Sequence, residues 1–157
     1  DYRGFIFIGL IKVGEEPMVI EYNCRMGDPE TEVVLPRLKN DLVELFRAVA
    51  NRKLDEMVVE TDPRVAATMV AVSGGYPGSY EKGFPISGLD HSPDGSLIFH
   101  SGTKLENGQV FTNGGRVLCV TAYSESLPDA IRKSIAVLRK IDFEGMYYRK
   151  DIGYEFL

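Results

Sequence analysis

The chain has 157 residues, of which 44% are hydrophobic and 26% charged, proportions that are typical of a globular protein and exclude a disordered or fibrous chain. Its net charge of −5 gives no bulk electrostatic support to nucleic-acid binding, and no apolar run approaches the roughly 20 residues of a membrane-spanning helix. The length suits one ordinary domain or two small ones. Cys24 and Cys119 lie far apart and show no metal-binding or disulfide-framework spacing, so we expect reduced thiols in a cytoplasmic protein.

Two strands joined by a short turn are predicted at the start of the chain. Residues 4–13 and 18–23 are rich in apolar and β-branched residues, and turn-forming residues separate them, so a hairpin is expected. The first strand is apolar on both faces, which predicts a covered, central place in a sheet. Because the chain starts at Asp1 and opens directly on this strand, we expect it to be part of a longer protein whose N-terminal part is missing.

Two helices are predicted next. Asp28 is expected to cap the first, with Pro29 at its first helical position, and Pro36 is expected to end it within two turns. The second helix is predicted over residues 40–51, because its apolar residues recur at helical spacing. Asn40 or Asp41 is expected to cap it.

A boundary between two parts of the chain is predicted in the polar residues 52–63. Short strands separated by Gly and Pro follow, and Ser126 is expected to cap one late helix. The strands are expected over 66–73, 96–100, 109–112 and 116–122, and the helix over 128–140. Strands with one late helix indicate a small α+β domain.

Glu21 and Asn23 alternate with Tyr22 on the second predicted strand, so their side chains share a face. Carboxylate and amide oxygens are hard donors that suit Mg²⁺, which fills its other positions with water and substrate phosphates. An ordinary solvated strand face is the alternative. Arg25 can bind a carboxylate or phosphate with its guanidinium fork, or form an ion pair with the acidic residues that follow. Asp28 would open a helix N-terminus that can also help to hold an anion.

Two glycine-rich turns in the second part are each followed by a cation, Lys104 and Arg116. Because glycine lets the backbone approach a ligand closely, each turn can contact a substrate phosphate. A hairpin turn with a solvated base is the alternative for each. His91 and His100 have no partner at ligand spacing, so a structural role is expected for both.

Several separated motifs resemble one known family. Residues 21–32, EYNCRMGDPETE, closely resemble the signature of the phosphoribosylamine–glycine ligase family, in which Arg and an apolar residue precede Gly-Asp-Pro-Glu, any residue, and Glu or Gln. Met26 stands where that family usually has Leu or Phe. Four further runs resemble the family's C-terminal region: SGGYPG (73–78), FHSGTK (99–104), TNGGRVL (112–118) and YRKDIG (148–153). The resemblance covers nearly the whole chain.

This resemblance implies an ATP-grasp enzyme of purine synthesis with an α+β fold. Residues 1–58 would be the last part of the ATP-grasp domain, made of antiparallel strands with helices. Residues 62–157 would be the C-terminal domain, β-rich with one late helix, which closes over the active site. In the family, the residues that match Glu21 and Asn23 bind Mg²⁺ or Mn²⁺. The lysines and the glycine-rich loop that hold ATP phosphates would lie upstream of Asp1.

The implied reaction joins glycine to 5-phosphoribosylamine with ATP, through a glycyl phosphate. Arg25 would be the catalytic residue that holds a carboxylate or phosphate near the acyl centre, and Asp28, Lys104 and Arg116 would also bind substrate. We expect negligible turnover by the isolated chain. Two alternatives remain open, an ATP-grasp ligase for another carboxylate and a non-catalytic binding or assembly module that retains the fold.

Overall fold

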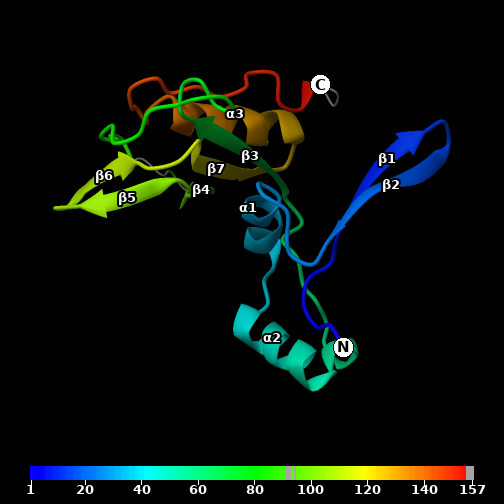
Figure 1. Cartoon of the computed structure of the whole chain (residues 1–157). Coiled ribbons are helices and arrows are strands. Elements are labelled where there is room, and N and C mark those ends of the chain that lie inside the picture. Colours follow the sequence, from blue (N-terminus) through cyan, green and yellow to red (C-terminus); the bar gives the residue numbers. More distant parts are fainter. Residues whose placement is uncertain (91–92, 94, 155–157) are drawn as a thin grey trace. The chain divides into compact units, whose positions relative to one another are not determined.

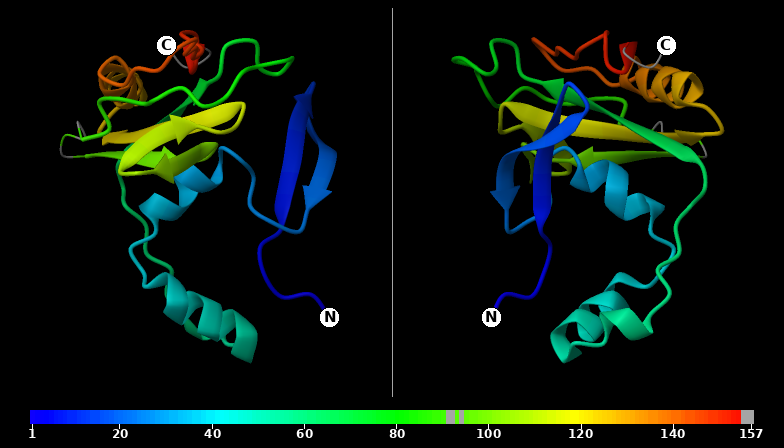
Figure 2. Two further views of the ribbon diagram at one scale, coloured as in Figure 1. Left: turned by 60° about the vertical axis from the view of Figure 1, so that its left-hand side comes forward. Right: turned by 90° about the vertical axis from the view of Figure 1, so that its right-hand side faces the viewer.

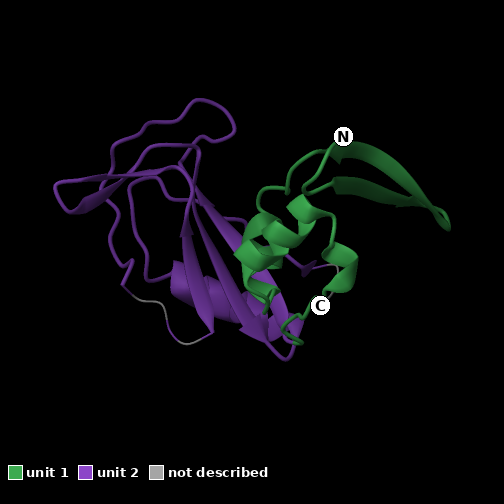
Figure 3. Ribbon diagram, turned by 90° about the horizontal axis from the view of Figure 1, so that it is seen from below, with its two compact units in different colours: residues 1–63 green, residues 64–157 purple. Residues whose placement is uncertain are grey.

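The structure, a computed structural model, describes residues 1–90, 93 and 95–154, and the chain divides into two compact units (Figure 3). Unit 1 is Asp1–Pro63 and unit 2 is Arg64–Leu157. The division falls at the end of the polar residues 52–63. None of the helices in the described residues is long and apolar enough to cross a membrane.

The predicted hairpin of unit 1 is confirmed. Strand β1 (Phe7–Val13) pairs antiparallel with β2 (Glu16–Asn23), and a bulge interrupts the pairing between Gly9 and Leu10 (Figure 1). The turn between the strands contains Gly14 with φ +62°, a left-handed backbone conformation that glycine adopts without strain.

The expectation that the first strand is covered and central is wrong for the described chain. In this structure β1 has only β2 as a paired neighbour, and apolar side chains of both strands are exposed. These exposed residues are Ile8, Leu10, Ile11, Val13, Met18, Val19, Ile20 and Tyr22. The pattern that predicted burial on both faces is real, but no element of the described chain supplies the covering surfaces.

The first helix of unit 1 begins later than its capping signal predicted. Helix α1 (Thr31–Val34) has Glu30, not Asp28, at its N-cap. The Asp28–Pro29 peptide is cis, and both the backbone N–H and the hydroxyl of Thr31 donate to the Gly27 carbonyl, at 3.0 and 2.6 Å. Residues 28–30 therefore form a turn ahead of the helix, which is why Asp28 does not cap it.

The remaining helical segments of unit 1 follow their sequence signals. The predicted stop at Pro36 is confirmed, because α1 gives way to a short 3₁₀ turn, η1 (Leu35–Arg37). Helix α2 (Leu42–Asn51) is capped by Asp41, whose carboxylate accepts hydrogen bonds from the backbone N–H groups of Val43 and Glu44. A second 3₁₀ turn, η2 (Leu54–Glu56), follows α2.

Unit 2 is built on a three-stranded antiparallel sheet in the order β3-β7-β4. Strands β3 (Val65–Val72), β4 (Ser96–His100) and β7 (Arg116–Ser124) match three of the predicted strands. Helix α3 (Leu127–Leu138) packs against β3 and β7 (Figure 2). The buried core of unit 2 includes Met69, Ala71, Val117, Leu118, Val120, Ala130, Ile131, Val137 and Leu138.

Helix α3 confirms the predicted cap at Ser126. The Ser126 hydroxyl accepts a hydrogen bond from the Asp129 N–H at 3.3 Å and donates to the Asp129 carboxylate at 2.7 Å. This arrangement satisfies one of the backbone donors that the first turn of a helix leaves unpaired. The mixture of antiparallel strands and few helices is the predicted α+β class.

A second hairpin in unit 2 includes a strand that the sequence interpretation missed. Strand β5 (Thr103–Glu106) pairs with the predicted strand β6 (Gln109–Thr112). Asn107 and Gly108 form the turn between them, with φ values of +49° and +81°. Two consecutive positive φ values are typical of the tightest hairpin turns, so the Asn-Gly dipeptide was the signal that would have revealed β5.

Candidate functional site

Glu21 and Asn23 point to the same face of β2, as their alternation predicts. The Asn23 side-chain amide donates from Nδ2 to Glu21 Oε1 at 3.0 Å. Its carbonyl oxygen Oδ1 is not used in this bond. A carboxylate and a side-chain amide group thus stand side by side at the end of an exposed strand.

The opposite strand leaves room for this pair. Gly9 lies directly across from Glu21 and Phe7 across from Asn23. A Cβ on Gly9 would lie 3.2 Å from Glu21 Cγ, tighter than ordinary contact, so the glycine lets the Glu21 side chain lean over β1. The pair lines a pocket of about 310 Å³. Its walls are Phe7, Gly9, Ile20, Glu21, Asn23, Arg25, Gly27, Asp28 and Glu30.

Arg25 and Asp28 line this same pocket, so the structure brings together the four candidate residues of unit 1. Arg25 is exposed and donates from Nη1 to the Met26 carbonyl oxygen at 3.0 Å. Among the ion pairs of the described ranges, none includes Arg25. Glu30 also lines the pocket, although it is not among the residues that the sequence analysis proposed for a site.

The donor set of this pocket fits a magnesium ion that shares its coordination with a nucleotide. The described residues include no group of three or more His, Cys, Asp or Glu side chains that could hold a metal by themselves. Mg²⁺ in nucleotide-dependent enzymes takes one or two carboxylates and completes its octahedron with water and phosphate oxygens. Glu21 and Asn23 provide hard oxygen donors without any thiolate or imidazole beside them in the pocket.

In unit 2 the two basic candidates are joined through the backbone. The Gly102 N–H donates to the Arg116 carbonyl oxygen at 2.8 Å, and Lys104 stands two residues further along on β5. Lys104 Nζ lies 2.9 Å from Glu106 Oε1, and both side chains are more than one-third exposed, so this surface pair holds Lys104 only weakly. Arg116 is the first residue of β7.

Backbone segments meet closely just before Arg116. The buried Ser73 donates two hydrogen bonds to the glycine turn. Its N–H donates to the Gly115 carbonyl at 2.8 Å, and its hydroxyl donates to the Gly114 carbonyl at 2.9 Å. A Cβ on Gly114 would lie 2.9 Å from Gly102 Cα. The glycines therefore permit a backbone-to-backbone contact that fixes the start of β7.

Of the two histidines, the structure describes His100. His100 Nδ1 lies 3.0 Å from the Thr103 hydroxyl oxygen, a local bond across the turn that precedes β5. His91 lies outside the described residues.

Comparison with known proteins gives one consistent family. The family described as "Phosphoribosylglycinamide synthetase, C domain" matches residues 66–155. Phosphoribosylamine–glycine ligase of Vibrio vulnificus (strain CMCP6) is 46% identical over 155 residues, which are 98% of this chain and 36% of that protein. The trifunctional purine biosynthetic protein adenosine-3 of Gallus gallus is 47% identical over 98% of this chain and 16% of its own length.

The fold comparison agrees with these relatives. The crystal structure of phosphoribosylamine–glycine ligase from Thermotoga maritima superposes with a TM-score of 0.75 at 36% sequence identity, over 96% of this chain and 37% of that one. The chain thus spans little more than a third of the Vibrio and Thermotoga proteins and 16% of the Gallus gallus protein.

Proposed function

Because the chain belongs to the phosphoribosylglycinamide synthetase family, we propose that it is part of an ATP-dependent ligase that joins glycine to 5-phosphoribosylamine. The product is glycinamide ribonucleotide, with ADP and phosphate released. Residues 1–58 are assigned to the end of an ATP-grasp domain and residues 62–157 to the C-terminal domain. The remainder of the enzyme, an N-terminal part, provides the other ATP contacts. The observation that carries this proposal is the pocket in which Glu21, Asn23 and Arg25 meet.

The chemistry has two steps. A carboxylate oxygen of glycine attacks the γ-phosphorus of ATP and ADP leaves, so that glycyl phosphate forms. The amine of 5-phosphoribosylamine then attacks the acyl carbon, phosphate leaves, and the nitrogen loses a proton as the amide forms. Both steps depend on aligning the reactants and neutralising charge on oxygen atoms rather than on a covalent protein nucleophile.

The residues of unit 1 are suited to that charge neutralisation. Glu21 and Asn23 would hold Mg²⁺, or Mn²⁺ in its place, which neutralises the ATP phosphates when bound. The Arg25 guanidinium, the catalytic residue of this proposal, orients a carboxylate or the transferred phosphoryl group with two parallel hydrogen bonds. Asp28, in the same pocket, contributes to substrate binding.

The residues of unit 2 are assigned to the other substrate. Lys104 and Arg116 bind its phosphate, since both follow glycine turns that let a ligand approach the backbone. We place this enzyme in the cytoplasm, where the thiols of Cys24 and Cys119 stay reduced.

Calorimetric titration of the full-length enzyme that contains this chain, with ADP in the presence of Mg²⁺, tests the metal assignment. In the presence of Mg²⁺, we expect the Glu21→Ala variant to bind ADP at least about tenfold more weakly than the wild type, because it lacks one charged metal ligand. Glu16→Ala, at the opposite end of β2, removes an exposed carboxylate of the same type and serves as the matched control. Equal metal-dependent binding by wild type and Glu21→Ala would favour the non-catalytic module.

An assay of ADP release tests the reaction itself. The 157-residue chain with glycine and phosphoribosylamine should show negligible turnover, and the longer enzyme that contains it should show rapid turnover with these two substrates. Turnover by the longer enzyme with a different carboxylic acid in place of glycine would instead identify a ligase for that acid.

A further inference from the structure

The first residues of the chain contact the end of β2, far away in the sequence. The phenol oxygen of Tyr2 lies 2.7 Å from the Phe5 carbonyl oxygen and 2.8 Å from the Cys24 carbonyl oxygen. A phenol carries one proton, so the two carbonyl groups share it as acceptors. Cys24 stands between Asn23, the last residue of β2, and Arg25. The bond therefore holds the backbone at the point where the candidate site residues leave the strand.

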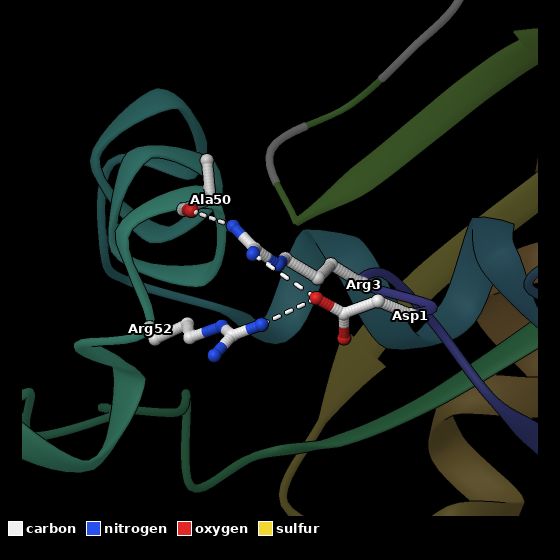
Figure 4. A network of polar contacts seen from close by, with 4 residues as sticks. All are labelled: Asp1, Arg3, Ala50 and Arg52. Atoms are coloured by element: carbon white, nitrogen blue, oxygen red, sulfur yellow. Dashed lines mark hydrogen bonds and ion pairs between the residues drawn. The ribbon is translucent and has the colours of Figure 1, made fainter.

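The same segment is tied to the C-terminal end of α2 (Figure 4). The Arg3 guanidinium donates to the carbonyl of Ala50, which lies in the last turn of the helix. Unpaired carbonyl groups at a helix C-terminus favour a cationic donor of this kind. The Asp1 carboxylate pairs with Arg52, the cap residue of α2, and with Arg3 at 3.2 Å.

Two neighbouring residues keep this segment in place. A Cβ on Gly4 would lie 2.8 Å from the Tyr2 hydroxyl oxygen and 3.2 Å from Tyr2 Cζ, so only glycine leaves room for the phenol ring. The ring of Phe5 packs edge-on against Phe46 of α2, with 5.9 Å between the ring centroids. Residues 1–5 therefore join α2 to the end of β2.

We propose that Tyr2 is a positioning residue for the candidate metal site, and that it acts by holding the Cys24 carbonyl between Asn23 and Arg25. The identity of the ligand, a divalent cation, rests on the proposed function. An exposed two-stranded hairpin frays at its ends unless another group fixes them. Since Tyr2 restrains the backbone on both sides of Cys24, Asn23 and Arg25 lose less conformational freedom when the cation binds. Tyr2 itself touches neither cation nor substrate.

Mn²⁺, added alone to the ¹⁵N-labelled 157-residue chain, is the probe for this inference. A bound paramagnetic Mn²⁺ broadens nearby amide resonances, so the Mn²⁺ concentration that half-broadens the resonances of residues 21–25 measures the affinity of the site. We expect Tyr2→Phe to need about threefold to tenfold more Mn²⁺, the factor that corresponds to the loss of one neutral hydrogen bond.

Three further variants make the measurement specific. Tyr22→Phe removes the hydroxyl of another exposed tyrosine on β2 itself and should bind Mn²⁺ like the wild type. Gly4→Ala pushes the Tyr2 hydroxyl away and should weaken binding about as much as Tyr2→Phe does. Glu21→Ala removes the proposed ligand and should abolish localised broadening. The amide chemical shifts of β1 and β2 residues outside 21–25, compared with those of the wild type before Mn²⁺ is added, detect a purely structural effect of each variant.

The outcomes separate the two proposals. Weaker Mn²⁺ binding by Tyr2→Phe and Gly4→Ala, with unchanged amide shifts in the rest of the hairpin and unchanged binding by Tyr22→Phe, supports the positioning role. Wild-type affinity in Tyr2→Phe together with loss in Glu21→Ala overturns the positioning role and leaves the proposed function standing. No localised broadening in the wild type, or none that depends on Glu21, overturns the positioning role, and the proposed function is then decided by the ADP titration. If Tyr2→Phe does not fold, Gly4→Ala decides the matter in the same way.

Discussion

Gly115 lies so close to the ring of Tyr76 that any side chain at this position would overlap two ring carbons. We therefore expect Gly115→Ala to destabilise unit 2 by about 1–3 kcal/mol, the usual effect of forcing an extra group into a packed site. Urea unfolding of the purified variant measures this loss. The same backbone turn fixes the start of β7, so a disturbance at Gly115 would also displace Arg116.

A double-mutant cycle identifies the cause of that destabilisation. In the Tyr76→Ala background the added methyl group at position 115 has no ring to overlap, so the effect of Gly115→Ala should shrink markedly. An effect of the same size in both backgrounds would mean that the ring contact is not responsible.

At the residue scale, sequence reasoning succeeded where backbone geometry alone decides the outcome. Glu21 and Asn23 share a face because side chains alternate along any strand, whatever surrounds it. Asp28 was assigned to a cap, yet Glu30 occupies that place, because the backbone turn at residues 28–30 determines where helical φ and ψ angles begin. The contact between Tyr2 and the Cys24 carbonyl was not predictable, since the two residues are 22 positions apart.

The first turn of α3 depends on the Asp129 carboxylate. Its pKa is lowered, mainly by the hydrogen bond from the Ser126 hydroxyl and further by the charge of Arg132. Because the pKa is lower in the folded state, the stabilisation is complete above the ordinary value of 3.8 and is lost as the pH falls through the folded-state pKa. We expect Asp129→Asn to flatten the pH dependence of the unfolding free energy in this acidic range.

Urea unfolding of the wild type and Asp129→Asn at a series of acidic pH values checks this expectation. Ser126→Ala is the matched control, since it removes the largest cause of the pKa shift while keeping the carboxylate. It should weaken the pH dependence in part and also remove the N-cap, at a loss of about 1 kcal/mol at neutral pH. If the unfolding free energy depended on acidic pH in the same way for all three proteins, the role of the Asp129 carboxylate would be contradicted.

At the scale of elements, local signals were sufficient for the hairpin and both longer helices. The caps at Asp41 and Ser126 and the stop at Pro36 act within one turn, so they can be read from the sequence. Strand β5 has little apolar alternation and is stabilised by its pairing with β6. The Asn-Gly turn dipeptide was therefore its one clear signal in the sequence. The exposure of β1 was not predictable, because its apolar pattern carries no information on whether covering elements are present.

At the scale of the whole molecule, the buried core belongs almost entirely to unit 2. Among the described residues, Leu45 and Ala48 are the buried apolar side chains of unit 1, and all the others lie in unit 2. Unit 1 also contains an apolar pocket of about 460 Å³ between α2 and residues 3–5. We therefore expect residues 64–157 to fold cooperatively on their own, whereas residues 1–63 depend on further packing.

Two measurements test this difference between the units. The urea midpoint of the fragment 64–157, followed by far-ultraviolet circular dichroism, should match the main transition of the full chain. Fluorescence of the apolar dye ANS should be strong with the full chain and weak with that fragment, since the exposed apolar hairpin lies in unit 1. Strong dye binding by the fragment, or loss of its cooperative transition, would show that unit 2 needs unit 1.

The contrast between the two cysteines has a practical consequence. Cys24 is exposed in unit 1, whereas Cys119 is fully buried in the central strand of unit 2. A maleimide fluorophore would modify Cys24 within the native fold and reach Cys119 only during transient opening of the β3-β7-β4 sheet. The ratio of single to double adducts in a mass spectrum, followed over time, then measures the rate of that opening. No engineered cysteine is needed, because the native sequence provides both thiols.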